Sequence, residues 1–133
     1  GSHAHVPEIE HILETLGPQK PPPITFIPHL LPLERGLYTS AAVPNTLKLS
    51  TDELLAHYRR SLGNSRFVRL GTAPPDIAHV VGTPFCDIGI SEDKRAGTIV
   101  ICAAIDNLVR GAAGQAVQNM NLMLGYEEQE GLI

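Results

Sequence analysis

The chain has 133 residues, of which 43% are hydrophobic and 18% are charged. This is the composition of a globular domain rather than of a disordered chain, and the length allows one domain or one piece of a larger one. The net charge of −4 at pH 7 argues against general attraction to nucleic acid or to anionic membranes. No apolar run approaches the roughly 20 residues of a membrane-spanning helix.

The first residues are compatible with two origins. Gly1-Ser2-His3 is either the remnant of a cleaved purification tag or native sequence, and no signal peptide is expected in so short and polar a stretch. A helix is predicted almost at once. Because an independent domain seldom begins in this way, the chain is expected to be a fragment.

The first predicted helix covers residues 7–16. Pro7 suits a first helical position, and Glu8 and Glu10 complement the positive end of the helix dipole. Apolar side chains then recur at helical spacing before Gly17 and Pro18 end the helix; they are Ile9, Ile12, Leu13 and Leu16. The proline-rich residues 17–23 are expected to form a stiff connector.

The second predicted helix begins with a capping box, in which Ser50 and Glu53 satisfy each other's backbone N–H groups. Basic residues in its last turn and Gly63 behind them are typical of a helix end. The apolar positions are Leu54, Leu55, Tyr58 and Leu62, and the basic ones are Arg59 and Arg60.

The third predicted helix runs over residues 107–124, with Asp106 as its N-cap and Gly125 at its end. Two glycines inside it, Gly111 and Gly114, cost about 1 kcal/mol each relative to alanine. Something should compensate for that cost. We therefore expect this helix to press closely against another element or a ligand.

Five strands are predicted between the helices. The last two should form a long hairpin around a charged loop, residues 91–97. The final strand is apolar on both faces, which is typical of a central strand. Together the elements predict an α+β fold with a mixed, largely antiparallel sheet and helices packed on one face. The predicted strands are residues 24–27, 37–43, 67–70, 85–90 and 98–105.

Both cysteines, Cys86 and Cys102, lie in apolar stretches. A secreted domain of this size usually carries more cysteines, so two buried thiols in a reducing cytoplasm are expected instead. A reactive thiolate needs an electropositive, accessible setting. Cys102 has none, and Asp87 would raise the pKa of Cys86, so neither is expected to be a nucleophile.

Histidines supply the first candidate site. His3 and His5 stand two residues apart with His11 beyond them, but a metal site needs three or four converging ligands and none is predicted. His5, close to a helix start, is a candidate for acid–base work. The alternative is an exposed N-terminal histidine without a role.

A proline-framed segment supplies the second candidate. His29 lies between Pro28 and Pro32, and Arg35 precedes Gly36. An arginine after such a rigid segment can hold a carboxylate or phosphate, although a solvated turn arginine fits equally well. Gly111 and Gly114 are too closely spaced for a dinucleotide-binding loop.

Several segments together resemble one family, the N-acetyl-γ-glutamyl-phosphate reductases. Residues 3–10 resemble its H-x-H-x-P-E-I-E stretch, and residues 24–36 resemble its I-x-F-x-P-H-L-x-P-x-x-R-G segment. Residues 81–89 and 106–121 resemble its closing blocks; the similar helix of aspartate-semialdehyde dehydrogenases is the nearest relative of the last. If His3 belongs to the first motif, it is native.

The resemblance implies a cytoplasmic enzyme of arginine biosynthesis that reduces an acyl phosphate to a semialdehyde with NADPH. It implies His5 as the catalytic histidine, although His3 is a rival for that role. Arg35, with His29 and His3, would lie near the anionic groups of the substrate. Asn107, Gly111 and Gly114 would face the nicotinamide of NADP.

The chain departs from the family because it lacks the upstream P-G-C-Y-P-T-type nucleophile motif and the nucleotide-binding domain. Residues 1–133 would then be the latter part of the substrate and oligomerisation domain, as in the glyceraldehyde-3-phosphate-dehydrogenase-like class. Residues 106–125 would be the helix that returns toward the cofactor domain. We expect partners in the remainder of the enzyme and a homo-oligomer, and no activity for the chain alone.

Two other functions fit the same residues. One is a related acyl-phosphate reductase of lysine or aspartate metabolism, against which the P-H-L-x-P-x-x-R-G segment argues. The other is a non-catalytic fragment that associates through its sheet.

Overall fold

The computed structural model describes residues 3–17, 21–62 and 65–133. It divides the chain into two compact units, Gly1–Pro32 and Leu33–Ile133. Part of the predicted connector and the predicted cap at Gly63 lie outside the described residues, as do Gly1 and Ser2. No helix within the described residues combines the length and apolarity that crossing a membrane requires.

The first unit is built around helix α1 (His5–Leu16), which begins two residues before its predicted start. The predicted strand at 24–27 is wrong, since these residues are extended but belong to no strand. The backbone N–H of Ile24 donates to the side-chain carboxylate of Glu10 at 3.2 Å instead of to a neighbouring strand. Pro28 then removes the next donor, so the segment cannot form a regular ladder.

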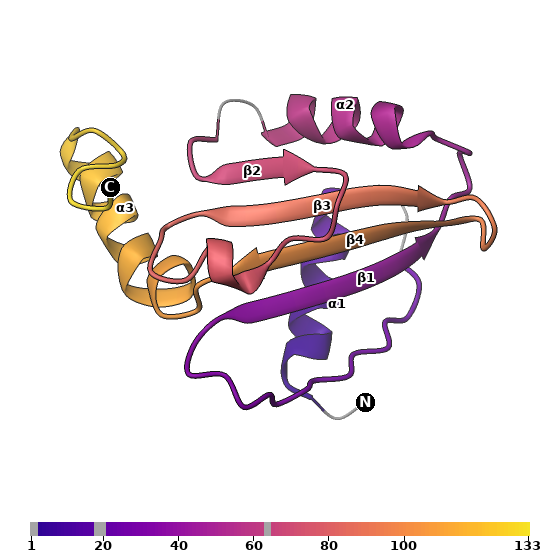
Figure 1. Ribbon diagram of the computed structural model, residues 1–133, viewed down its shortest axis with the longest axis horizontal. Helices are drawn as coiled ribbons and strands as arrows, with labels where there is room; N and C mark the ends of the chain where they lie inside the picture. The colour runs from indigo at the N-terminus through magenta and orange to yellow at the C-terminus, as the bar shows by residue number, and fades with distance from the viewer. Residues whose placement is uncertain (1–2, 18–20, 63–64) are drawn as a thin grey trace. The chain divides into compact units, whose positions relative to one another are not determined.

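The second unit is a four-stranded sheet, and Figure 1 shows its strands side by side in the order β1-β4-β3-β2. β4 pairs antiparallel with both β1 and β3, whereas β2 pairs parallel with β3. The predicted α+β class with a mixed, largely antiparallel sheet is therefore confirmed, and β4 is an internal strand as its apolar sequence predicts. The strands are β1 (Leu37–Pro44), β2 (Val68–Gly71), β3 (Cys86–Asp93) and β4 (Thr98–Ile105).

Helix α2 (Thr51–Leu62) covers one face of the sheet over β2 and β3. Its capping box forms as predicted: the Ser50 N–H donates to the Glu53 carboxylate at 2.8 Å, and the Glu53 N–H points back to the Ser50 hydroxyl at 3.4 Å. Leu54 and Leu55 are buried against the sheet, where Ile90 is fully buried. Such a cap contributes about 1 kcal/mol, while the apolar contacts supply most of the packing energy.

The opposite face is covered by the connection between the parallel strands, residues 72–85, which carries the short helix η1 (Ile77–His79). Figure 1 shows this connection passing in front of β3 and β4. Val80 in this connection and Ala104 on β4 are both fully buried. Arg69 on β2 bonds the Asp87 carboxylate at 2.8 Å and the carbonyl of His79 at 3.2 Å, which ties the connection to the sheet.

The hairpin between β3 and β4 is tighter than predicted. β3 continues to Asp93, so three residues of the predicted loop 91–97 belong to the strand. The Asp93 carboxylate accepts the Ala96 N–H at 3.0 Å and closes the turn. The sequence did not predict this longer strand because its last residues are charged. A strand with one side open to solvent tolerates charged residues on that side.

The third helix differs from its prediction at the start. A π-helical turn, η2 (Val109–Ala113), precedes α3 (Gly114–Leu124), and Gly125 ends α3 in the left-handed conformation as predicted. A Cβ at Gly114 would lie 2.6 Å from the Val109 side chain, whereas one at Gly111 would meet nothing closer than 3.7 Å. Gly114 is thus required by the wide turn of its own helix. The expected close contact with another element holds for neither glycine among the described residues.

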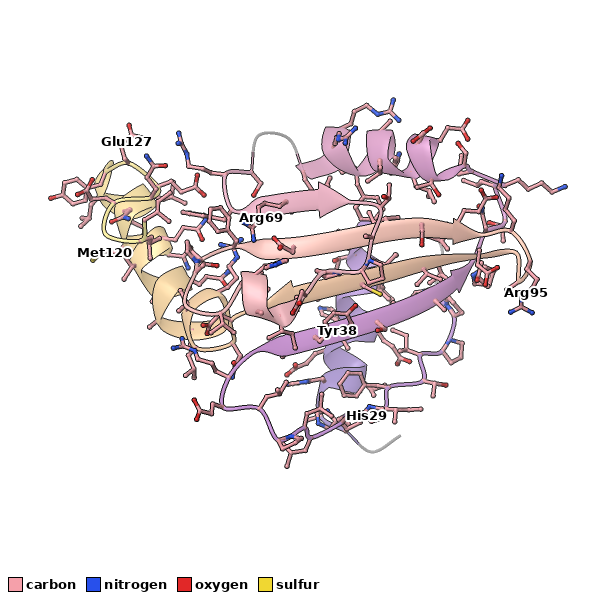
Figure 2. All side chains as sticks on the ribbon, in the orientation of Figure 1. His29, Tyr38, Arg69, Arg95, Met120 and Glu127 are labelled. Atoms are coloured by element: carbon pink, nitrogen blue, oxygen red, sulfur yellow. The ribbon has the colours of Figure 1, made fainter. Side chains whose placement is uncertain are left out.

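The C-terminal residues fold back along α3. Figure 2 labels Met120 on the helix and Glu127 on the segment that follows it. Asn121 is 2% exposed, and its amide donates to the carbonyls of Glu128 at 3.3 Å and Glu130 at 2.9 Å. Because these bonds satisfy a buried side-chain amide, they hold the tail on one face of the helix.

We expect Gly89→Ala to destabilise the protein by about 3 kcal/mol or more. A Cβ at this position would lie 2.1 Å from the Ala73 carbonyl oxygen, and that neighbour is backbone. Gly71 is the matched control, since it pairs with Gly89 in the adjacent strand and has open space around its Cβ position. Urea unfolding should show Gly71→Ala within about 1 kcal/mol of the unaltered protein. Equal losses from the two variants would contradict the close approach.

Candidate functional site

The site of the second unit is organised by Asp106, whose carboxylate is fully buried. One oxygen, Oδ1, accepts the backbone N–H groups of Leu108 at 2.9 Å and Val109 at 3.1 Å. The predicted N-cap role of Asp106 is therefore confirmed. The other oxygen, Oδ2, accepts the Gly82 N–H at 2.6 Å and a guanidinium N–H of Arg35 at 2.7 Å.

These contacts keep Asp106 ionised. Burial by itself would raise the pKa of the carboxyl, but the bonds from Gly82, Arg35, Leu108 and Val109 outweigh it and lower the pKa from 3.8 to about 2. A carboxylate without such donors would be driven to protonate in the interior. The charge is therefore a permanent part of the site at neutral pH.

Arg35 is held at one end only. Its Nη2 forms the ion pair with Asp106, and its side chain is 34% exposed. The Nε–H is buried and has no hydrogen-bond partner among the described residues. Since guanidinium carries five N–H donors, Arg35 retains unused donors next to a buried negative charge.

A groove of about 860 Å³ lies beside Arg35. Most of its lining residues are apolar, and two of them, Glu34 and Asp76, are acidic. Tyr38, one of the lining residues, is labelled on β1 in Figure 2; the neighbouring Cys102 thiol, together with burial, raises the pKa of Tyr38 to about 12, so the phenol stays neutral. The lining residues are Leu33, Glu34, Arg35, Tyr38, Pro75, Asp76, Ile77, Ala78 and Val81.

Asn107 bonds the backbone next to this arginine. Just beyond the Leu37–Ile105 pair of β1 and β4, the Asn107 Oδ1 accepts the Gly36 N–H at 2.7 Å. The structure thereby brings together Arg35 and Asn107, two of the predicted site residues. The Nδ2 amide of Asn107 has no partner within the part of the chain that the structure describes, and it is available to donate to a ligand.

The predicted histidines lie in the first unit. The His3 and His5 rings are 4.8 Å apart, and Phe26 packs on His3 at 4.9 Å. The His5 N–H donates to the His3 Nδ1 at 3.3 Å, just where α1 begins. His29 is exposed, with its Nδ1 3.0 Å from the Ile27 carbonyl oxygen. Because these residues and Arg35 belong to different units, a shared pocket stays a prediction.

Gly111 lies in the π-helical turn and is exposed, while Gly114 is buried at the start of α3. Their role toward a cofactor stays a prediction. Within the described residues, no three metal-ligating side chains converge.

The thiols match their predicted character. Cys86 is half-buried and Cys102 is buried, and neither is in a disulfide. Burial raises the pKa of Cys86, Arg110 opposes that effect, and Asp87 adds to it. A thiol with a raised pKa is a poor nucleophile at neutral pH.

The pairing of Asp106 with Arg35 is not predicted from the sequence. An aspartate before a helix is an ordinary N-cap, so the residue was already accounted for. The signal was present in the pairing of two apolar strands: once residues 37–43 and 98–105 are paired antiparallel, the residues just before the first strand must face those just after the second.

The chain is similar to known proteins over nearly its whole length. Residues 1–107 match the family described as "Semialdehyde dehydrogenase, dimerisation domain". The chain belongs to that family. It is also 46% identical over 98% of its length to a protein from Rubrobacter xylanophilus named N-acetyl-gamma-glutamyl-phosphate reductase. Proteins of the same name from Geobacter metallireducens and Methanocaldococcus jannaschii are 47% and 44% identical over 99% and 98% of the chain.

The similarity extends over nearly all of this dimerisation-domain chain but over only 38% of each of those relatives. The resemblance to N-acetyl-γ-glutamyl-phosphate reductases is therefore confirmed. The family match, residues 1–107, includes the histidine pair, Arg35 and Asp106.

The depressed pKa of Asp106 predicts how stability depends on pH. A carboxyl whose pKa is lower in the folded state stabilises fully above its unfolded pKa, and this stabilisation disappears as pH falls through the folded value. A shift from 3.8 to about 2 corresponds to about 2 kcal/mol. The difference in unfolding free energy between the unaltered protein and Asp106→Asn should accordingly be largest above pH about 5 and shrink toward pH about 2. A difference that does not change with pH in urea titrations would contradict this assignment.

Proposed function

We propose that this chain is the latter part of the substrate and oligomerisation domain of an N-acetyl-γ-glutamyl-phosphate reductase. The complete enzyme would use NADPH to reduce N-acetyl-γ-glutamyl phosphate to the semialdehyde, with release of phosphate, in the arginine biosynthesis of the cytoplasm. One observation supports it most: Arg35 is held beside a buried carboxylate and next to Asn107, in a chain that resembles reductases of that name along its whole length.

Each role follows from the chemistry of the residue. A thiol from sequence outside this chain would displace phosphate to form a thioester, and NADPH would supply the hydride. His5 would give and take the protons, which the start of a helix beside His3 suits. Arg35 would bind an anionic group of the substrate with the donors that Asp106 leaves free, and His29 and His3 would assist it.

The start of the third helix supports a limited role toward NADP. The N–H groups of Leu108 and Val109 already donate to Asp106, so this helix start cannot also cradle a phosphate. The Nδ2 of Asn107 remains free to bond the carboxamide of a nicotinamide, with Gly111 and Gly114 beside it. Most of the cofactor would be held by a nucleotide-binding domain outside this chain, toward which residues 106–125 would return.

We expect the purified chain to show no reductase activity, because its two thiols are shielded and it offers no dinucleotide cradle among its described residues. The reverse reaction gives a direct assay: N-acetylglutamate semialdehyde, phosphate and NADP⁺ should yield NADPH only with the complete enzyme. Phosphate-dependent NADPH formation by the chain alone would overturn the assignment of roles.

The same assay, run with different semialdehydes, distinguishes an N-acetyl-γ-glutamyl-phosphate reductase from the related acyl-phosphate reductases. The complete enzyme should prefer N-acetylglutamate semialdehyde to the corresponding semialdehydes of lysine and aspartate metabolism. A preference for one of those would establish the alternative enzyme without changing the fold.

A second candidate is a non-catalytic fragment that assembles through its sheet, and the exposure of β1 favours it. All eight residues of β1 are exposed, and Leu37 and Val43 keep 47% and 41% of their surfaces accessible. Apolar surface of this kind usually marks an interface. Homo-oligomerisation and inactivity of the isolated chain are common to both candidates, so the second is favoured only if the complete protein that contains this chain assembles but has no reductase activity.

The two faces of β1 offer a matched test of assembly. Ala41 and Ala42 are adjacent and exposed, and their side chains point to opposite faces of the sheet. A glutamate that enters an apolar interface costs several kcal/mol, because a charge is buried without a partner. Light scattering should therefore show a smaller particle for Ala41→Glu or for Ala42→Glu, but not for both. A strict monomer at high concentration would exclude assembly through this sheet.

A further inference from the structure

The starting point is a guanidinium whose donors the fold uses only in part. An Nη2 donor of Arg35 bonds Asp106. The Nε–H is buried and lacks a partner among the described residues, so a ligand cannot reach it in this orientation. The side chain is nevertheless 34% exposed, and its exposed end is suited to a ligand oxygen.

Asp106 decides where that exposed end faces. Its carboxylate is anchored by three backbone N–H groups from two segments, those of Gly82, Leu108 and Val109. It therefore cannot follow the arginine if the arginine moves. A long side chain with many rotamers is held in one orientation by a fixed, buried charge, so its ordering is complete before a ligand arrives.

The surroundings agree with this reading. Arg35 lines a groove of about 860 Å³ whose walls are largely apolar, so an anion there would meet few competing donors. Glu34 and Asp76 also line the groove, and their charges disfavour an anion bound anywhere but at the guanidinium. The ion pair with Asp106 leaves the exposed third of Arg35 as the cationic surface.

We infer that Asp106 is a positioning residue: it orients the Arg35 guanidinium so that the exposed N–H groups of the guanidinium donate to an anionic oxygen of the substrate. This inference rests on the proposed function for the identity of the substrate. It adds a residue that touches no substrate itself and acts through Arg35.

The test is a double-mutant cycle in the complete reductase that contains this chain. Arg35→Lys keeps a charge for Asp106 but removes the remaining guanidinium donors, and Asp106→Asn places an amide N–H against two donors. Each change should raise the KM for N-acetyl-γ-glutamyl phosphate about 10- to 100-fold with a smaller effect on kcat, as the loss of a charge-assisted hydrogen bond implies. The KM of the double variant should be no higher than that of the more impaired single variant, because both changes remove the same contact.

Asp93 provides the matched control. Its carboxylate also accepts a backbone N–H, that of Ala96 at 3.0 Å, but in the hairpin turn. Asp93→Asn should leave the KM unchanged. Effects of Asp106→Asn and Arg35→Lys that simply multiply, or an unchanged KM in either variant, would overturn the inference.

A second variant and a second readout keep the test decisive if Asp106→Asn fails to fold. Asp106→Glu retains the charge but displaces the carboxylate by one methylene, and it should still raise the KM. In ¹⁵N spectra of the unaltered enzyme, the Arg35 Nε–H signal should shift on addition of N-acetylglutamate or inorganic phosphate. Asp106→Glu should abolish that shift.

The spectra also separate the two hypotheses. An enzyme that does not reduce N-acetyl-γ-glutamyl phosphate sinks the proposed function, but an anion-dependent Nε–H shift that requires Asp106 would still support its positioning role. An Arg35 signal that neither anion moves would overturn the inference whatever the activity.

Discussion

A single buried negative charge holds the functional end of this domain together. Asp106 joins the end of β4, the segment before β1 and the connection that leads to β3, because its two oxygens bond groups from all three. Burial of a charge is unfavourable unless donors surround it, and here three backbone N–H groups and a guanidinium do so. If the ends of β1 and β4 moved apart, the buried carboxylate of Asp106 would lose hydrogen-bond donors, which is unfavourable.

The sheet explains why these groups meet at all. β4 lies between β1 and β3, so the residues that precede β1 and those that follow β4 are placed at the same edge. The parallel pairing of β2 with β3 requires a connection across the face of the sheet, and that connection brings Gly82 to the same point. Local sequence supplies the strands, but the meeting of Arg35, Gly82 and Asp106 is a product of topology.

Much of the fold could be predicted from local patterns. The capping box at Ser50, the apolar residues of β4 and the glycine at 125 each have one dominant physical interpretation, and the structure has all three features. The prediction of a strand at residues 24–27 is wrong because an apolar run indicates an extended segment but does not show whether a second strand pairs with it. The predicted end of β3 is wrong because charged residues are typical of loops but also occur on the solvent-facing side of a strand.

The candidate site was harder to predict for a related reason. Arg35 and Asn107 were found separately, by residue type and by resemblance, while their connection depends on contacts between residues about 70 positions apart. Asp106 was recognised only as a helix cap. The sequence indicates the local role of such a residue, here the capping of the following helix. Its contact with a distant residue, here Arg35, can be predicted only when the register between the strands is known. The relation of the histidine pair to this cluster lies between two units and was beyond local reasoning.

The π-helical turn after Asn107 carries a further consequence for how this segment can vary. A wide turn contains one residue more than an α-helical turn over the same path, and one residue rotates the following helix by about 100°. Deleting any single residue from this turn would rotate α3 together with the C-terminal residues that Asn121 holds, and would carry Gln129 away from Arg66, which bonds it at 2.7 Å. Substitutions in the turn can be absorbed one at a time, whereas its length is tied to this contact beyond the end of α3. The number of residues between Asp106 and α3 is thus a stricter constraint on this segment than the identity of most side chains within it.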